Sequence, residues 1–186
     1  MESSRRHQIR GQLLAMMPKG AVCAEVGVWE GNFSERILNE CDPKELNLID
    51  PWLFQPEFNN TAFGRRLNEH LMEDRYLSVV EKFKEDPRVA IHRAKSEDGL
   101  AALPDHSLDW IYLDGNHNEP FIGQDLEMSL RKVKLDGIIS GDDFYWERER
   151  CGAPVKRAVE ALIGLLGARA KLTLMANQYF IQLKRS

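Results

Sequence analysis

Charge of one sign is not concentrated anywhere in the sequence, and long apolar runs are missing. The 25 basic and 29 acidic residues give a net charge of −4, without the basic cluster that nucleic-acid binding needs. No segment approaches the roughly 20 apolar residues that span a bilayer. The basic N-terminus also lacks the continuous apolar core of a secretory signal. We therefore expect a cytoplasmic protein that binds neither nucleic acid nor membrane.

Cysteine is scarce as well. Cys23, Cys41 and Cys151 are odd in number and scattered, and they lack the CxxC spacing of many metal and redox sites. We predict three reduced thiols with no role in metal binding.

The GxGxxG pattern of dinucleotide binders is also absent. The first apolar run continues instead as Glu25-Val-Gly27-Val-Trp-Glu-Gly31, with glycines where a strand turns into a helix. A pyrophosphate needs a third glycine there, so a diphosphate cofactor is disfavoured. Asp50 ends the next expected strand, and its carboxylate can accept hydrogen bonds from a ribose diol. A nucleoside ligand therefore fits. The alternatives are that Asp50 caps a helix or is a solvated strand end, and that Glu25 is a buried acid held by backbone amides.

Apolar runs alternate with amphipathic stretches along the 186 residues, of which 43% are hydrophobic. This alternation predicts one α/β domain over 1–186 with a Rossmann-like, doubly wound, mostly parallel sheet of seven strands. Residues 1–20 are expected to form an N-terminal helical segment. Strands are expected at 21–28, 46–50, 88–94, 108–114 and 137–143. The last two strands, joined at Ala176 and Asn177, form an antiparallel hairpin.

Helices are expected between the strands, at 32–38, 65–84, 120–134 and from Pro154 onward. Asn32 and Glu35 have the spacing of a capping box. Residues 51–64 hold neither the helical nor the strand period, which predicts a loop. Because parallel sheets bind ligands beyond the carboxyl ends of their strands, we expect the functional residues at those ends.

Acidic residues follow the fourth and fifth expected strands. If these strands are parallel neighbours, Asp114, Asp142 and Asp143 emerge at one edge, with the strands about 5 Å apart. Carboxylates that close raise each other's pKa unless a cation neutralises them. Oxygen ligands suit Mg²⁺, or Mn²⁺ or Ca²⁺, so these residues predict a divalent-metal site. In the alternative, Asp142 caps the following turn and Asp143 is solvated.

These motifs, taken in order, resemble a known family. ExGxxxG after the first strand, an acid ending the second, and DG followed later by GDD are similar to class I S-adenosylmethionine-dependent methyltransferases with a Rossmann-like fold. The portion IYLDGNH…DLEMSLRKVKLDGIISGDDF resembles the macrocin O-methyltransferase branch and its small bacterial relatives. The resemblance runs from about Val22 to the final hairpin.

The resemblance implies roles for the residues that match. Glu25, Gly27 and Gly31 would surround the methionine moiety and the sulfonium, Asp50 would hold the ribose hydroxyls, and the loop of Ser96 would lie along the adenine. Asp114 would border the cofactor and, with Asp142 and Asp143, bind a metal such as Mg²⁺. His117 would take the proton from the substrate hydroxyl, because a neutral imidazole can act as a base near pH 7. Its alternative role is that of a surface histidine in a turn.

The sequence and the resemblance together predict a metal-assisted O-methyltransferase. Its partner would be a small-molecule methyl acceptor, such as a catechol, a sugar or a natural-product diol, and a homo-oligomer is compatible with the sequence. Aromatic residues in 51–64 and 144–150 are expected to shape the acceptor pocket: Trp52, Phe54, Phe58, Phe63, Phe144, Tyr145 and Trp146. Three alternatives stay open: a metal-independent N- or C-methyltransferase, a non-catalytic nucleoside-binding subunit, and a nicotinamide-dependent dehydrogenase.

Overall fold

A computed structural model describes residues 2–147 and 152–185 of the chain. Cys151 and the end of the 144–150 segment lie outside the described residues. The strands are β1 (Val22–Val26), β2 (Glu45–Asp50), β3 (Val89–Arg93), β4 (Leu108–Leu113), β5 (Val133–Gly141), β6 (Ala170–Met175) and β7 (Gln178–Leu183). The α-helices are α1 (Glu2–Leu14), α2 (Asn32–Cys41), α3 (Met72–Phe83), α4 (Ser96–Ala102), α5 (Phe121–Lys132) and α6 (Pro154–Leu166). Short 3₁₀ helices are η1 (Pro56–Phe58), η2 (Arg66–Leu71) and η3 (Gly167–Arg169).

The strands form one sheet in the order β3-β2-β1-β4-β5-β7-β6. The first five are parallel to one another, and β7 pairs antiparallel with both β5 and β6. This confirms the predicted Rossmann-like fold with its C-terminal hairpin. The order reverses at β1, between β2 and β4, where open parallel sheets bind their ligands.

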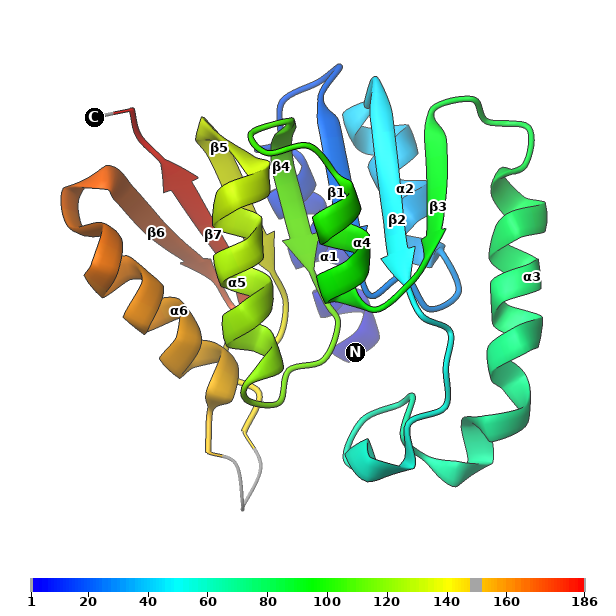
Figure 1. Ribbon diagram of the computed structural model, residues 1–186. Helices are drawn as coiled ribbons and strands as arrows, with labels where there is room; N and C mark the ends of the chain where they lie inside the picture. Colours follow the sequence, from blue (N-terminus) through cyan, green and yellow to red (C-terminus); the bar gives the residue numbers. More distant parts are fainter. Residues whose placement is uncertain (1, 148–151, 186) are drawn as a thin grey trace.

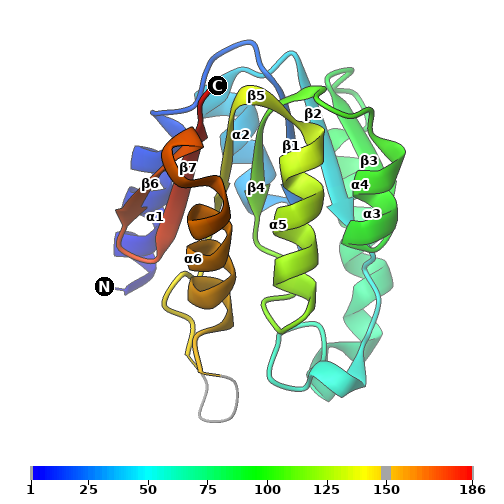
Figure 2. The same ribbon diagram turned by 60° about the vertical axis from the view of Figure 1, so that its left-hand side comes forward.

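Helices cover both faces of the sheet (Figures 1 and 2): α1, α2 and α3 lie on one face, and α4, α5 and α6 lie on the other. The central strand β4 supplies both cores because successive side chains point to opposite faces. Trp110 and Tyr112 pack under α1 and α2, whereas Ile111 and Leu113 pack under α5. Each is at most 1% exposed, and burial of such side chains contributes about 1.5–3 kcal/mol apiece.

Three local predictions differ from the structure. Gly31, in the left-handed region at φ 71°, is the N-cap of α2 without any side-chain cap bond, so the capping box of Asn32 and Glu35 is wrong. The helix expected over 65–84 is divided into η2 and α3. Helix α4 was not predicted, because its seven residues are too short to show a period. It is held close to β2, where a Cβ on Gly99 would lie 2.5 Å from the Ile49 side chain.

The carboxyl ends of the parallel strands all lie at one edge of the sheet. The 51–71 segment after β2 and residues 142–147 after β5 extend beyond this edge (Figure 1). Every described helix is too short or too polar to cross a bilayer.

Candidate functional site

A cavity of about 760 Å³ opens at the carboxyl edge of the sheet. This size is typical of sites for nucleosides and drug-sized molecules. Its wall includes most of the predicted site residues: Glu25, Gly27, Asp50, Ser96, Asp114, His117 and Asp143. Gly31 and Asp142 do not line it. Arg6 and Arg10 from α1, which the sequence analysis did not single out, do.

The turn after β1 brings backbone from two strands together. Gly27 has φ 87°, and a Cβ on it would lie 2.2 Å from the carbonyl oxygen of Asp114 at the end of β4. Only glycine permits both the backbone conformation and this approach. At Gly31, a Cβ would come within 2.8 Å of the Phe83 ring. Gly27 therefore shapes this side of the cavity, whereas Gly31 lets α2 pack against Phe83 of α3.

Asp50 holds the same turn through its carboxylate. Its Oδ2 accepts the backbone N–H groups of Val28 at 2.9 Å and Trp29 at 3.0 Å, and its Oδ1 accepts that of Trp52 at 2.7 Å. Burial raises the pKa of Asp50 against the opposing effect of these bonds. Asp50 thus fixes the start of the β1–α2 turn, and its contact with a ribose stays a prediction.

Glu25 is a buried acid with an uncharged partner. It is 1% exposed, and the Ser34 hydroxyl on α2 donates to it at 2.5 Å. Burial raises the pKa of Glu25 to about 8, although the hydrogen bond from Ser34 opposes the shift. A cationic ligand in the cavity would favour the ionised form of this carboxyl group. Ser34 had no signal in the sequence beyond its place in the first turn of a helix.

Ser96 begins α4 and borders the cavity beside Lys95. Burial raises the pKa of Asp125 on α5 to about 6, and the hydroxyl of Ser96 opposes this shift. The loop that the resemblance assigns to adenine therefore lies near α5.

The acids at the ends of β4 and β5 lie side by side. Leu113 pairs with Gly141 in the sheet register, so Asp114 and Asp142 follow at neighbouring positions. Asp143 comes next with φ 59°, and its Oδ1 accepts a hydrogen bond of 2.9 Å from Asn177. The parallel pairing that the sequence suggested thus brings the three acids together.

Two arginines from α1 bind these acids. Arg10 Nη2 donates to Oδ2 of Asp114 and, at 2.6 Å, to Oδ2 of Asp142. Arg6 donates to the same Asp142 oxygen from Nε at 2.9 Å and from Nη2 at 2.5 Å. Burial lowers the pKa of Arg10, but the carboxylate charges outweigh it, so the guanidinium stays charged. The i, i+4 spacing of Arg6 and Arg10 was the sequence signal that we missed.

Asp142 is turned away from the cavity and is fully buried. Besides both arginines, the Gln178 side chain and the Asp143 backbone N–H, the latter at 2.7 Å, donate to it. Its carboxylate is therefore occupied by the chain's own donors.

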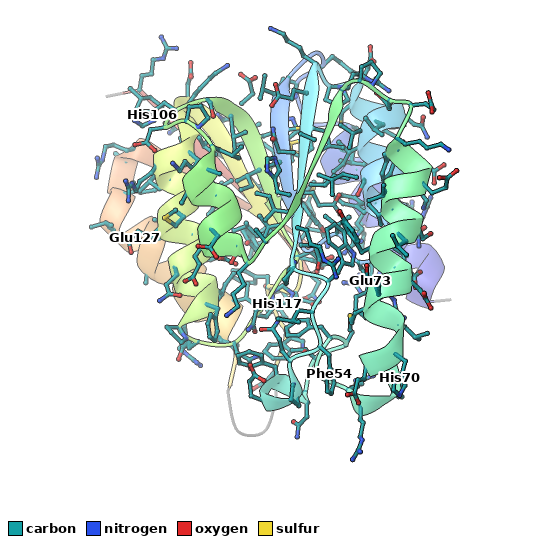
Figure 3. All side chains as sticks on the ribbon, turned by 45° about the vertical axis from the view of Figure 1, so that its right-hand side comes forward. Phe54, His70, Glu73, His106, His117 and Glu127 are labelled. Atoms are coloured by element: carbon teal, nitrogen blue, oxygen red, sulfur yellow. The ribbon has the colours of Figure 1, made fainter. Side chains whose placement is uncertain are left out.

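His117 lies between the two other acids. Its Nε2 is 3.5 Å from Oδ1 of Asp114 and 3.4 Å from Oδ2 of Asp143. Burial lowers the pKa of His117, but the two carboxylates outweigh this and raise it to about 9. The imidazole is thus mostly protonated at neutral pH. In Figure 3, His117 lies at the edge of the sheet from which the segment of Phe54 extends, and His106 lies at the opposite edge.

A divalent ion was predicted on Asp114, Asp142 and Asp143. Potential ligand atoms of Asp114, His117 and Asp143 lie within 4.8 Å of one another, but Asp142 is not in this group. The three carboxylates already face two guanidiniums and one imidazolium. The predicted set of three carboxylates does not fit a dication in this arrangement. The negative charge of the carboxylates, which was the reason to expect a metal, is already balanced by the two guanidiniums and the imidazolium.

The predicted aromatic residues divide between the core and the cavity. Trp52 and Phe144 are only 2% exposed and belong to the core. The cavity wall includes Phe58 and Phe63, together with Phe121, which the sequence analysis missed. Phe54 and Tyr145 are not part of that wall. Trp146 borders the cavity, with its ring centroid 5.9 Å from that of His117.

Comparisons with known proteins agree with this geometry. A family model described as a methyltransferase domain matches residues 24–144. No curated relative matches the chain by sequence. Many solved structures share its fold, among them the following three.

The first is a protein from Corynebacterium glutamicum, 15% identical with a TM-score of 0.66, where the match covers 100% of this chain and 82% of that one. The O-methyltransferase NovP is 19% identical with a TM-score of 0.63, covering 98% and 79%. The O-methyltransferase TomG from Streptomyces achromogenes, involved in tomaymycin synthesis and solved in complex with S-adenosylmethionine, is 14% identical with a TM-score of 0.60, covering 97% and 80%.

Proposed function

The chain belongs to the S-adenosylmethionine-dependent methyltransferase family that has this domain, and from that premise we propose that it methylates a hydroxyl oxygen of a small molecule. The donor, when bound, supplies an electrophilic methyl group on a sulfonium. The observation that carries the proposal is the placement of His117. It lies in the cavity wall, between two acids and beside Trp146, at the end of β4 next to the β1 turn.

The two halves of the cavity would bind the two reactants. Glu25 and the turn held by Asp50 would border the sulfonium side, and a carboxylate there favours a cation. Phe58, Phe63 and Trp146 would enclose an apolar or aromatic acceptor on the other side. Holding the acceptor oxygen in line with the methyl group supplies much of the rate enhancement in such a transfer.

His117 would receive the proton of the acceptor hydroxyl. Because Asp114 and Asp143 raise its pKa to about 9, only the deprotonated fraction can act as a base, and this fraction grows as the pH rises. A sulfonium bound nearby is itself a cation, so it would lower the pKa of the imidazole toward neutrality. Asp114 and Asp143 would stabilise the imidazolium once the proton has been transferred.

The test is a labelled-methyl transfer assay with the purified chain and a set of phenols, diols and amines. We expect the label on an oxygen of a phenol or diol. Transfer to amines alone would replace this proposal with the N-methyltransferase alternative. Donor binding without transfer to any acceptor would favour a nucleoside-binding subunit.

A further inference from the structure

We infer that Arg10, with Arg6 beside it, is the resident cation of the acid cluster formed by Asp114, Asp142 and Asp143, and that this methyltransferase needs no divalent metal. The inference concerns the charge of the site and holds whichever acceptor is methylated. The inference depends on the position of the two guanidiniums, on the contacts that hold them, and on the ligand atoms that remain for a metal ion.

Arg10 occupies the bridging position between two strand ends. A single atom, Nη2, donates both to Asp114 after β4 and to Asp142 after β5. A dication that joined these two carboxylates would need the same space between them. Arg6 adds a second positive charge to Asp142 and lies 3.7 Å from Oδ1 of Asp143.

The guanidinium of Arg10 is fixed by its surroundings. It lies over the rings of Phe33, at 4.7 Å, and Tyr112, at 5.6 Å from the centroid, and the side chain is only 16% exposed. Tyr112 donates to Gln178 at 2.7 Å, and Gln178 in turn donates to Asp142. Cation–π contacts of a desolvated arginine, together with the Tyr112–Gln178–Asp142 hydrogen bonds, hold this arrangement more firmly than a surface ion pair would be held.

Helix α1 is docked so that it presents both arginines to the cluster. Leu13 and Leu14 at its end are buried in the core with Phe33 and Ile37 of α2. Arg36 of α2 also donates to the backbone carbonyl of His7 at 2.9 Å. The positive charge is therefore built into the fold by a helix that packs on the sheet.

An incoming ion would meet this charge. The remaining candidate ligands are Asp114, His117 and Asp143, and Asp114 is shared with Arg10. A dication there would lie next to the guanidinium of Arg10. Like charges at such distances repel strongly in a partly buried site, so metal affinity should be weak until Arg10 is removed.

The experiment is a Mn²⁺ titration of the full chain followed by electron paramagnetic resonance. For the wild type we expect no saturable site below about 1 mM Mn²⁺, the affinity range of loosely held ions. Arg10→Met should bind Mn²⁺ at least about tenfold more tightly, because it removes the competing charge beside Asp114. Adding Asp114→Asn to Arg10→Met should abolish the gain. Arg131→Met, which removes an exposed arginine of the last turn of α5 at the other edge of the sheet, is the matched control and should behave as the wild type.

Two outcomes would overturn the inference. One is micromolar Mn²⁺ binding by the wild type that Asp114→Asn abolishes. The other is a folded Arg10→Met variant that binds Mn²⁺ no more tightly than the wild type. Circular dichroism checks the fold of each variant. Should Arg10→Met fail to fold, the wild-type titration still decides, and Arg6→Met, whose side chain is 52% exposed, is the milder second variant. No step of the test depends on methyl transfer, so the proposed reaction and this inference can fail separately.

Discussion

Acids line both halves of the cavity, but their partners differ. On the β1–β2 side, Glu25 is bonded to a hydroxyl and Asp50 to backbone amides, which carry no charge. On the β4–β5 side, Asp114 and Asp142 are bonded to guanidiniums. Uncharged donors add no positive charge to the first half, so a cationic ligand there would favour the ionised form of Glu25, whose pKa burial raises to about 8. On the second side, the guanidiniums already balance the carboxylates. The first half therefore lacks a cation of its own, as the proposed binding of a sulfonium requires, whereas the second half has its cations built in.

The largest expected effect comes from removing a cation on the β4–β5 side of the cavity. Arg10→Ala should lower the free energy of unfolding by about 3–5 kcal/mol, because it leaves the fully buried Asp142 with a weakened charge balance. Urea denaturation followed by circular dichroism measures it. The double variant Arg10→Met with Asp142→Asn, which removes both charges, should lose clearly less. A loss below about 1 kcal/mol in Arg10→Ala would mean that the pair behaves as a surface ion pair.

The next effect concerns His117, at the border of the two halves. His117→Gln should lower kcat by about 100-fold, the usual contribution of a general base. In the wild type, kcat/KM for S-adenosylmethionine should rise with pH as the imidazole of the free enzyme loses its proton, and should level off above about 9. The plateau of kcat should come at a lower pH, because the bound sulfonium lowers the pKa of His117. His106→Gln, at the opposite edge of the sheet, is the control and should leave the rate and its pH profile unchanged. A His117→Gln variant with the wild-type profile would remove His117 from the reaction.

A smaller effect tests the uncharged partners of the first half. The pKa of Glu25 is raised by burial from 4.5 to about 8, so the folded state binds its proton more tightly than the unfolded state does. Its contribution to stability is therefore complete below pH 4.5 and is lost as the pH rises toward 8. Between pH 6 and 7.5, the unliganded wild type should lose about 2 kcal/mol relative to Glu25→Gln. Equal pH slopes of the two proteins in urea denaturation would contradict this assignment.

The smallest expected effect lies at the acceptor side. Trp146→Ala should raise the acceptor KM by roughly fivefold to tenfold, about 1 kcal/mol, because a ring beside His117 is lost. The KM for S-adenosylmethionine should not change. Tyr145→Ala, which alters an exposed neighbour outside the cavity wall, is the control. An unchanged acceptor KM in Trp146→Ala would place the acceptor elsewhere in the cavity.

The strands and most helices were predictable from the sequence. The strands are continuous apolar runs that are buried on both faces of the sheet, and most helices are long enough to show their period. Strand order then followed from the βαβ alternation, and it correctly brought Asp114 next to Asp142. Helix α4 escaped prediction because its seven residues are too short to show a period, and its close packing on Ile49 of β2 at Gly99 is a tertiary contact. A pattern of single residues does not carry such contacts.

The partners of the site residues were predictable only where they are local in sequence. His117 and Asp114 are three residues apart, and their proximity followed from the turn. Arg10 and Asp142 are separated by more than a hundred positions, so only the docking of α1 reveals that they pair. The charge argument for a metal was sound in its premise that the acids need a cation. That cation was identified as a metal ion, because the sequence does not show that the arginines of α1 lie at this edge of the sheet.

The most direct test of the difference between the two halves is thermal unfolding of the wild type with S-adenosylmethionine and MgCl₂, added singly and together. At about 100 times its Kd, the sulfonium ligand should raise Tm by about 5–10 °C, with or without Mg²⁺. Mg²⁺ alone should leave Tm unchanged. A rise produced by Mg²⁺ alone, or a S-adenosylmethionine effect that appears only when Mg²⁺ is present, would contradict the account.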